Sequence, residues 1–92
     1  MSRYSTTMSN GMAISAVRID ERVEDVEVND VELIVRLKDG RRLAAPLDWF
    51  PRLKAASPAQ RAHWEFAAAG LGVHWPDIDE DISIAGLLRV AA

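Results

Sequence analysis

The sequence predicts an α+β domain: a small antiparallel sheet, made of a three-stranded meander plus one further short strand, flanked by two or three short helices. Three observations support this fold class. Apolar and polar residues alternate over 23–47, an Asp39-Gly40 pair interrupts that alternation, and helix-start signals follow from residue 48 onward. A chain of 92 residues, 49% of them apolar, suffices for one core and excludes two domains.

We expect a single domain over 14–92, preceded by a disordered leader over 1–13. The leader is rich in Ser, Thr, Met and Asn and has no sustained period. The chain has no cysteine, which excludes disulfides and cysteine metal sites. It also lacks an apolar run of the length of a signal peptide or a membrane span, so a cytoplasmic location is expected.

The meander is predicted strand by strand. Alternation over 23–28 places Val26 and Val28 on one face, and Asn29-Asp30 offers two residues that tolerate the positive φ of a tight hairpin. The next strand is expected to point Val31, Leu33, Val35 and Leu37 inward and Glu32, Ile34, Arg36 and Lys38 outward. Asp39-Gly40 predicts the second hairpin, and residues 41–47 form the third strand.

Charge is unevenly distributed behind the modest net value of −3. Residues 20–32 hold seven acids and one base, residues 36–61 hold seven bases and two acids, and residues 77–81 hold four acids. Pairing of adjacent strands would bring the first two blocks together on the outward face of the meander. The residues expected to meet there are Glu27, Glu32, Arg36, Lys38 and Arg42.

Two helices are predicted after the meander. Asp48 is expected to cap a helix over 49–56 with Pro51 in its first turn. The run Ser57-Pro58-Ala59-Gln60 predicts a second helix with a capping box, reaching about Phe66 and burying Trp64.

A short strand and a last helix are predicted beyond Gly70 and Gly72. Residues 73–75 are expected to join the sheet, with His74 facing away from the buried side, and Pro76 ends this strand. Ser83 is expected to cap a final helix whose apolar residues are Ile84, Leu87 and Leu88, although Gly86 weakens it by roughly 1 kcal/mol.

Three segments together resemble the bacterial domain of unknown function 2442 family over residues 16–90. They are Asp39-Gly40-Arg41-Arg42, the run PLDWFPRL over 46–53 and the run HWPDIDEDIS over 74–83. The resemblance implies a sheet flanked by short helices and no established activity, so no catalytic residues are transferred. Some relatives carry the domain before a helix-turn-helix unit, for which this chain is expected to lack room. Others look like partners in toxin–antitoxin-type pairs.

A metal site or an active site would centre on His74 and Asp77. Nearby candidate ligands are Asp79, Glu80, Asp81 and His63. A calcium loop does not fit, because Ile82 stands where glycine is required and Leu88 where glutamate is required. Carboxylates ahead of a helix starting at Ile84 explain the same acids, and no nucleophile elbow or phosphate loop is present. We therefore expect no metal, no cofactor and no enzyme activity.

The function predicted from the sequence is a small non-enzymatic interaction module that binds another protein or a second copy of itself. A nucleic-acid-binding module using the bases of 36–61 is the alternative, and a metal protein or enzyme is a third. The aromatic residues Trp49, Phe50, Trp64, Phe66 and Trp75 are expected in the core, and any Trp that is exposed would be a candidate interface centre. The candidate partner-binding residues are Trp49, Arg52, Arg41, Arg42, His74 and Asp77.

Overall fold

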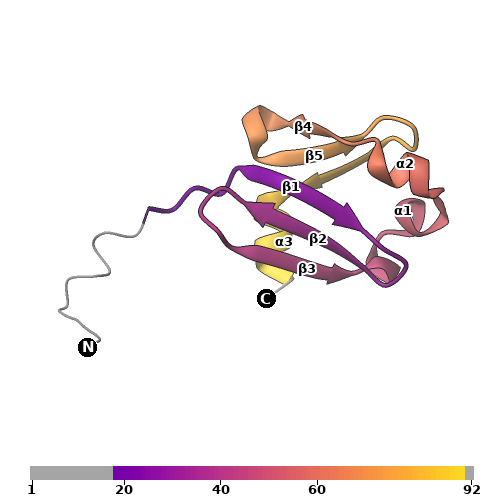
Figure 1. Cartoon of the computed structure of the whole chain (residues 1–92), viewed down its shortest axis with the longest axis horizontal. Helices are drawn as coiled ribbons and strands as arrows, with labels where there is room; N and C mark the ends of the chain where they lie inside the picture. Colours follow the sequence, from indigo (N-terminus) through magenta and orange to yellow (C-terminus); the bar gives the residue numbers. More distant parts are fainter. Residues whose placement is uncertain (1–17, 91–92) are drawn as a thin grey trace.

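The computed structural model describes residues 18–90 and confirms the predicted α+β fold class (Figure 1). The predicted leader over 1–13 lies outside the described residues. Within them the chain forms two three-stranded antiparallel sheets and three short α-helices. The strands are β1 (Val23–Val28), β2 (Glu32–Leu37), β3 (Arg42–Pro46), β4 (Glu65–Ala67), β5 (Gly72–Trp75) and β6 (Glu80–Ser83). The α-helices are α1 (Pro51–Ala55), α2 (Pro58–Ala62) and α3 (Ile84–Val90).

The first sheet is the predicted meander, in the order β1-β2-β3. Val26, Val35 and Leu43 stand in register across its three strands and are all buried, so the alternating pattern has the expected phase. A β-bulge between Val23 and Asp25 interrupts the register of β1.

The first hairpin turn differs from the prediction. Asn29 donates its N–H to the carbonyl of Glu32 (3.1 Å), so the turn residues are Asp30 and Val31 rather than Asn29-Asp30. The Asn29 side chain accepts the N–H groups of Val31 and Glu32, each at 2.8 Å, which shapes the turn without a positive φ. Val31 is consequently 74% exposed rather than inward, and the predicted outward residue Ile34 is buried.

The second hairpin turn is confirmed at Asp39-Gly40. Leu37 donates to the carbonyl of Arg41 (2.9 Å), which leaves a three-residue loop, and Gly40 takes the left-handed conformation that this loop requires (φ 97°). A side chain at Gly40 would therefore strain the turn.

The second sheet, in the order β4-β5-β6, was not predicted as a separate sheet. Residues 73–75 do form a strand, but they pair with β4 and β6 instead of joining the meander. The helix expected to reach Phe66 ends at Ala62, because Phe66 pairs with Val73 across β4 and β5. A left-handed turn at Ala68, Ala69 and Gly70 (φ 52°, 57° and 89°) reverses the chain between these strands.

The segment after β3 is a 3₁₀ turn, η2 (Leu47–Trp49), followed by α1. Asp48 does not cap a helix as predicted, because it lies inside η2 and its carboxylate accepts from Lys54. Phe50 occupies the N-cap of α1 without a side-chain hydrogen bond. Pro51 lies in the first turn, as expected, although the helix starts at Pro51 and not at Trp49.

The capping box of α2 is confirmed. Ser57 Oγ accepts the N–H of Gln60 (3.1 Å), and Gln60 Oε1 accepts the N–H of Ser57 (3.0 Å). Ser83 Oγ likewise accepts the N–H of Gly86 (3.0 Å) at the start of α3.

Replacing Ser57 with alanine is expected to lower the free energy of unfolding by about 1 kcal/mol, since the N–H of Gln60 loses its acceptor. Ser57→Thr, which keeps a hydroxyl acceptor, should cost less. Urea denaturation followed by circular dichroism measures both changes, and equal losses in the two variants would contradict a capping role.

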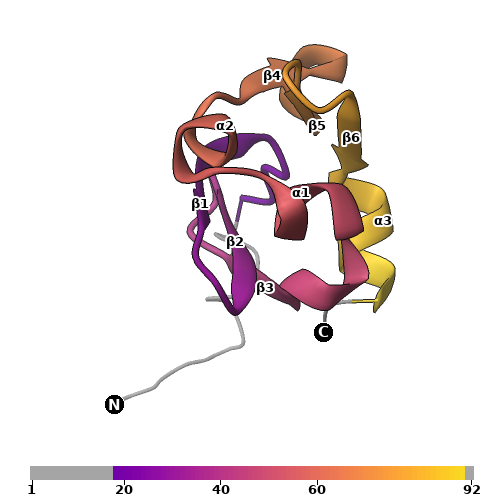
Figure 2. The ribbon, with the colours of Figure 1, turned by 90° about the vertical axis from the view of Figure 1, so that its right-hand side faces the viewer.

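The core lies between the two sheets and the helices α1 and α3 (Figures 1 and 2). Trp75 is fully buried there, and its indole N–H donates to the carbonyl of Arg61 (3.0 Å). Figure 2 shows α1 and α3 on one side of the first sheet and α2 beside β1. No helix within residues 18–90 has the length and apolar character to cross a bilayer.

Two aromatic residues predicted for the core lie on the surface. Trp49 is 49% exposed and Phe66 is 56% exposed, whereas Phe50 and Trp64 are half-buried against the core. Phe66 contacts Trp64 edge to face, with ring centroids 5.3 Å apart. The exposed Trp49 is therefore the tryptophan to examine as an interface centre.

Candidate functional site

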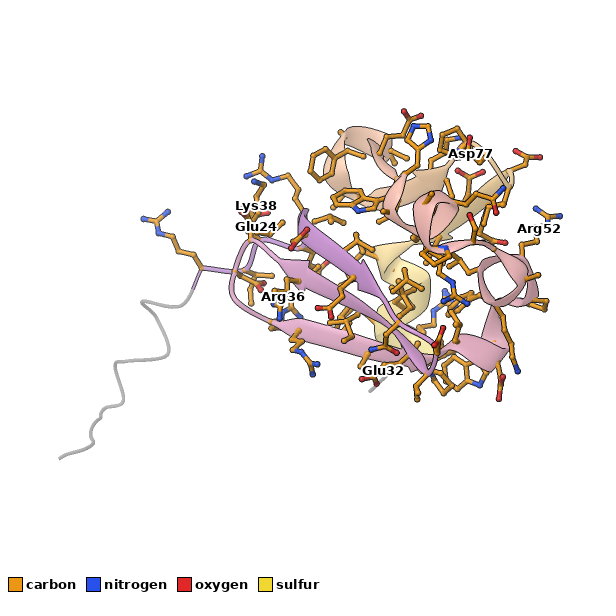
Figure 3. All side chains as sticks on the ribbon, turned by 45° about the vertical axis from the view of Figure 1, so that its right-hand side comes forward. Glu24, Glu32, Arg36, Lys38, Arg52 and Asp77 are labelled. Atoms are coloured by element: carbon orange, nitrogen blue, oxygen red, sulfur yellow. The ribbon has the colours of Figure 1, made fainter. Side chains whose placement is uncertain are left out.

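The six residues predicted to bind a partner fall in separate regions rather than one site. Arg41 and Arg42 lie at the β2–β3 hairpin, whereas Trp49 and Arg52 follow the opposite end of β3, roughly 17 Å away along the strand. Figure 3 shows Lys38, beside that hairpin, and Arg52 at opposite ends of the molecule. His74 lies on the second sheet, and Asp77 lies in the turn after it.

Arg41 holds a cluster of carboxylates around the hairpin. Its guanidinium donates to Asp39 Oδ2 (2.8 Å) and to Glu21 Oε2 (3.4 Å), and its backbone N–H donates to Asp39 Oδ1 (3.1 Å). Asp39, whose side chain is only 4% exposed, also accepts the N–H of Asp20 (3.0 Å). Arg41 thus joins the hairpin to the segment before β1.

Hydrogen bonds from neighbouring arginines lower the pKa of two carboxylates in this region. Hydrogen bonds from the Arg41 side chain and backbone lower the pKa of Asp39 from 3.8 to about 2. Hydrogen bonds from the Arg22 side chain and backbone lower the pKa of Asp20 to about 2. Both carboxylates are therefore ionised in the folded protein well below the pH at which they protonate in an unfolded chain.

Acid should destabilise the domain between about pH 4 and pH 2. A lowered pKa in the folded state means that the stabilisation from Asp39 and Asp20 is complete above about pH 4 and is lost as the pH falls through 2. Thermal unfolding of the wild type and Asp39→Asn at pH 5, 3 and 2 measures this loss. The variant should show a shallower decline, and parallel curves would contradict the assignment.

The outward face of the first sheet carries part of the predicted charge pairing. Arg36 Nη1 lies 3.9 Å from Glu27 Oε1, as expected, while Lys38 Nζ lies 3.3 Å from Glu24 Oε1. Glu32 and Arg42 form no ion pair with another residue of the described range 18–90. Figure 3 shows Glu24 beside Lys38.

The predicted constellation around His74 and Asp77 separates into two pairs. His74 Nδ1 lies 2.8 Å from Asp81 Oδ1, and His63 Nδ1 lies 2.9 Å from Asp77 Oδ2. The four acids of 77–81 occupy the β5–β6 turn and β6, which leads directly into α3 at Ile84. Among residues 18–90 no three His, Asp or Glu side chains gather as metal ligands would.

Trp49 borders a hollow of about 350 Å³ between η2, β6 and α3. Its apolar lining residues are Trp49, Phe50, Ile82, Leu87 and Val90, and Glu80, Asp81, Ser83 and Gly86 complete the lining. Arg52 donates to the carbonyl of Asp79 and so ties α1 to the turn that leads into β6. We call this region the Trp49 groove. Of the candidate residues only Trp49 lines it, and Arg52 stands beside it.

Sequence reasoning did not connect Trp49 with β6. Alternation of apolar and polar residues indicated strands only in the meander. No local pattern indicates that η2 lies beside residues 80–83. Leu87, which helps to complete the groove, was named only as an apolar residue of the last helix, and Val90 was not named.

A family model described as "Protein of unknown function (DUF2442)" matches residues 23–92. The chain belongs to the DUF2442 family. The resemblance seen in the sequence is thereby confirmed.

Two solved structures are similar to this chain in fold. A protein of unknown function from Rhodospirillum rubrum is 30% identical with a TM-score of 0.63, over 74% of this chain and 84% of that one. An uncharacterized protein from Chromobacterium violaceum is 27% identical with a TM-score of 0.63, over 74% of this chain and 64% of that one. No curated protein matches this DUF2442 member.

Proposed function

We propose that this DUF2442 chain is a non-enzymatic interaction module that binds a partner protein at the Trp49 groove. One observation carries the proposal: a tryptophan is half exposed beside an apolar hollow that runs along an edge strand. Tryptophan is among the residues that contribute most to binding energy at protein interfaces. Val90, which is 60% exposed and also lines the hollow, extends the apolar surface.

The charge distribution favours this function over nucleic-acid binding. Five bases of 36–61 lie within 4 Å of a carboxylate, which offsets the charge available to phosphates: Arg36, Lys38, Arg41, Lys54 and Arg61. A mobility shift of labelled DNA at low salt would support the alternative instead.

The contacts of the two histidines also favour an interaction module over a metal protein or enzyme. His63 and His74 each contact a different carboxylate, so the chemistry expected around His74 and Asp77 has no common centre. The class of partner follows from the family resemblance: we propose a protein encoded beside this one, as in a toxin–antitoxin-type pair.

Co-expression with the product of the neighbouring gene tests the proposal. The tagged wild-type chain should retain that protein through size-exclusion chromatography. Trp49→Ala should weaken the complex about thirtyfold, the loss expected when an interface hot spot is truncated. Phe66→Ala is the matched control, since it removes an aromatic side chain of similar exposure on a different element, and it should bind as the wild type does.

Two results would contradict the proposal. Either the neighbouring protein fails to bind the wild-type chain, or Trp49→Ala and Phe66→Ala weaken binding equally. Circular dichroism of both variants shows whether each has kept the fold.

A further inference from the structure

We infer that the partner supplies an extended segment that adds to β6 as a fourth strand, placing a basic residue opposite Asp81 and apolar residues on either side of it in the Trp49 groove. This inference rests on the proposed function and specifies the mode of binding and the chemistry of the partner.

The outer edge of β6 has backbone groups available for such pairing. Ile84 donates to the carbonyl of Leu71 (3.0 Å), one step beyond the Gly72↔Ser83 pair of the β5–β6 register. Hydrogen-bonded and non-hydrogen-bonded pairs alternate along an antiparallel ladder, so Asp81 and His74 form a non-hydrogen-bonded pair. The N–H and C=O of Asp81 therefore point away from β5, toward the outer edge.

Nothing else in the described part of the chain occupies that edge. The second sheet ends at β6, and within residues 18–90 the backbone of Asp81 has no hydrogen-bond partner among side chains or loops. Arg52 binds only the carbonyl of Asp79, just before the strand begins. The free backbone groups of this edge are thus centred on Asp81, because Glu80 and Ile82 bond to β5 and the Ser83 hydroxyl caps α3.

The side chains beside this edge favour a partner segment whose residues alternate in character. Ile82 lies on the core side of β6 and Asp81 on the opposite side, since successive strand residues face opposite ways. An added residue paired with Asp81 would point to the side of that carboxylate. Its two neighbours would point toward the core side, where Trp49 and Leu87 line the hollow.

Charge selects a basic partner and disfavours a second copy of this strand. Asp81 is 71% exposed at its side chain, and Asp79 and Glu80 precede it. Pairing β6 with another β6 would bring these acids together, whereas a Lys or Arg opposite Asp81 gains a cross-strand ion pair. We therefore expect three consecutive residues of the partner segment to be apolar, basic and apolar.

The edge strand β1 is a weaker candidate for strand addition, although a hollow of about 450 Å³ adjoins it. The bulge between Val23 and Asp25 disrupts its ladder, which is a common protection of sheet edges. Arg61 also bridges α2 to Asp30 (2.9 Å) across that hollow. Within the described residues β6 has no such bulge, and the Arg52 bridge from α1 reaches the carbonyl of Asp79, before β6 begins.

A random dodecapeptide library displayed on phage, selected on the full chain, tests the inference. Selected peptides should share an apolar-basic-apolar core, and synthetic copies should bind at least tenfold more weakly to Trp49→Ala and to Asp81→Lys. Glu27→Lys, the same charge reversal on the other sheet, is the matched control and should bind as the wild type does. Asp81→Asn keeps the size of the side chain and should give an intermediate loss of binding. It replaces Asp81→Lys in the test if that variant does not fold.

Backbone methylation of the peptide distinguishes strand addition from side-chain docking alone. An N-methyl group on the basic residue blocks the N–H that would bind the carbonyl of Asp81, and should weaken binding at least tenfold. The same group on the next residue, whose N–H faces solvent, should have little effect.

The outcomes separate this inference from the proposed function. Peptides that need Trp49 but tolerate methylation at both positions would overturn strand addition and leave the Trp49 groove as a binding surface. Peptides that bind equally well to Trp49→Ala would overturn the inference. An acidic or uncharged consensus, or no selected peptide at all, would overturn the inference, while binding of the neighbouring protein separately decides the proposed function.

Discussion

Replacing Trp75 with alanine is expected to unfold most of the domain. The side chain is fully buried between the two sheets, and removing a core aromatic residue costs about 3–5 kcal/mol. The substitution also leaves the carbonyl of Arg61 without its indole donor. A domain of this size has a stability near the lower end of the usual range of roughly 5–15 kcal/mol, so the loss approaches the whole.

Far-UV circular dichroism and urea denaturation measure this effect. Trp75→Phe should lose less, since most of the apolar volume remains and only the indole hydrogen bond disappears. Phe66→Ala should cost about 1 kcal/mol or less, because Phe66 is exposed and chiefly contacts Trp64. A Trp75→Ala variant as stable as Phe66→Ala would show that the Trp75 side chain does not stabilise the packing of the two sheets.

The features predicted correctly from the sequence are those whose causes lie within a few residues. The capping box of α2 needs only Ser57 and Gln60, and the second hairpin needs only Gly40 at a left-handed position. The meander follows from alternation together with these turns. Such signals are independent of what packs on the sheet, and the structure reproduces them.

The wrong predictions concern segments decided by distant partners. Residues 64–69, Trp-Glu-Phe-Ala-Ala-Ala, favour a helix by propensity, yet pairing of Phe66 with Val73 makes part of this run a strand. The left-handed turn at Ala68 and Ala69 costs free energy and is retained because it lets β4 pair with β5. A single sequence contains no local sign of that compensation.

The candidate site was predicted only in part for the same reason. Trp49 was named from its residue type, but its exposure depends on η2 lying at the border of β6 and α3. Arg41 and Arg42, named for their charge, lie at the far end of β3, and Arg41 holds Asp39. The residue types were informative, whereas their grouping depended on the packing of the two sheets.

Replacing Leu53 with alanine is expected to disrupt the Trp49 groove as well as the core. Leu53 is fully buried and is the one residue of α1 that reaches the core, and a Leu→Ala change of this kind costs 2–5 kcal/mol. Losing this side chain removes the apolar contact between α1 and the core, while the hydrogen bonds from Arg61 to the carbonyls of Leu53 and Lys54 remain. Leu53→Met, which nearly conserves volume, should cost less than about 1.5 kcal/mol.

The indole N–H signals in ¹⁵N NMR spectra show both effects at once. Trp75, whose indole is buried and hydrogen-bonded, should exchange slowly with solvent, and Trp49 should exchange rapidly. In Leu53→Ala, at a urea concentration where the fold is retained, the Trp49 signal should shift while the Trp75 signal stays in place, because α1 loosens before the sheets separate. A Trp49 signal unchanged in Leu53→Ala would mean that η2 is held by β3 and α3 alone, and the groove would then not depend on α1.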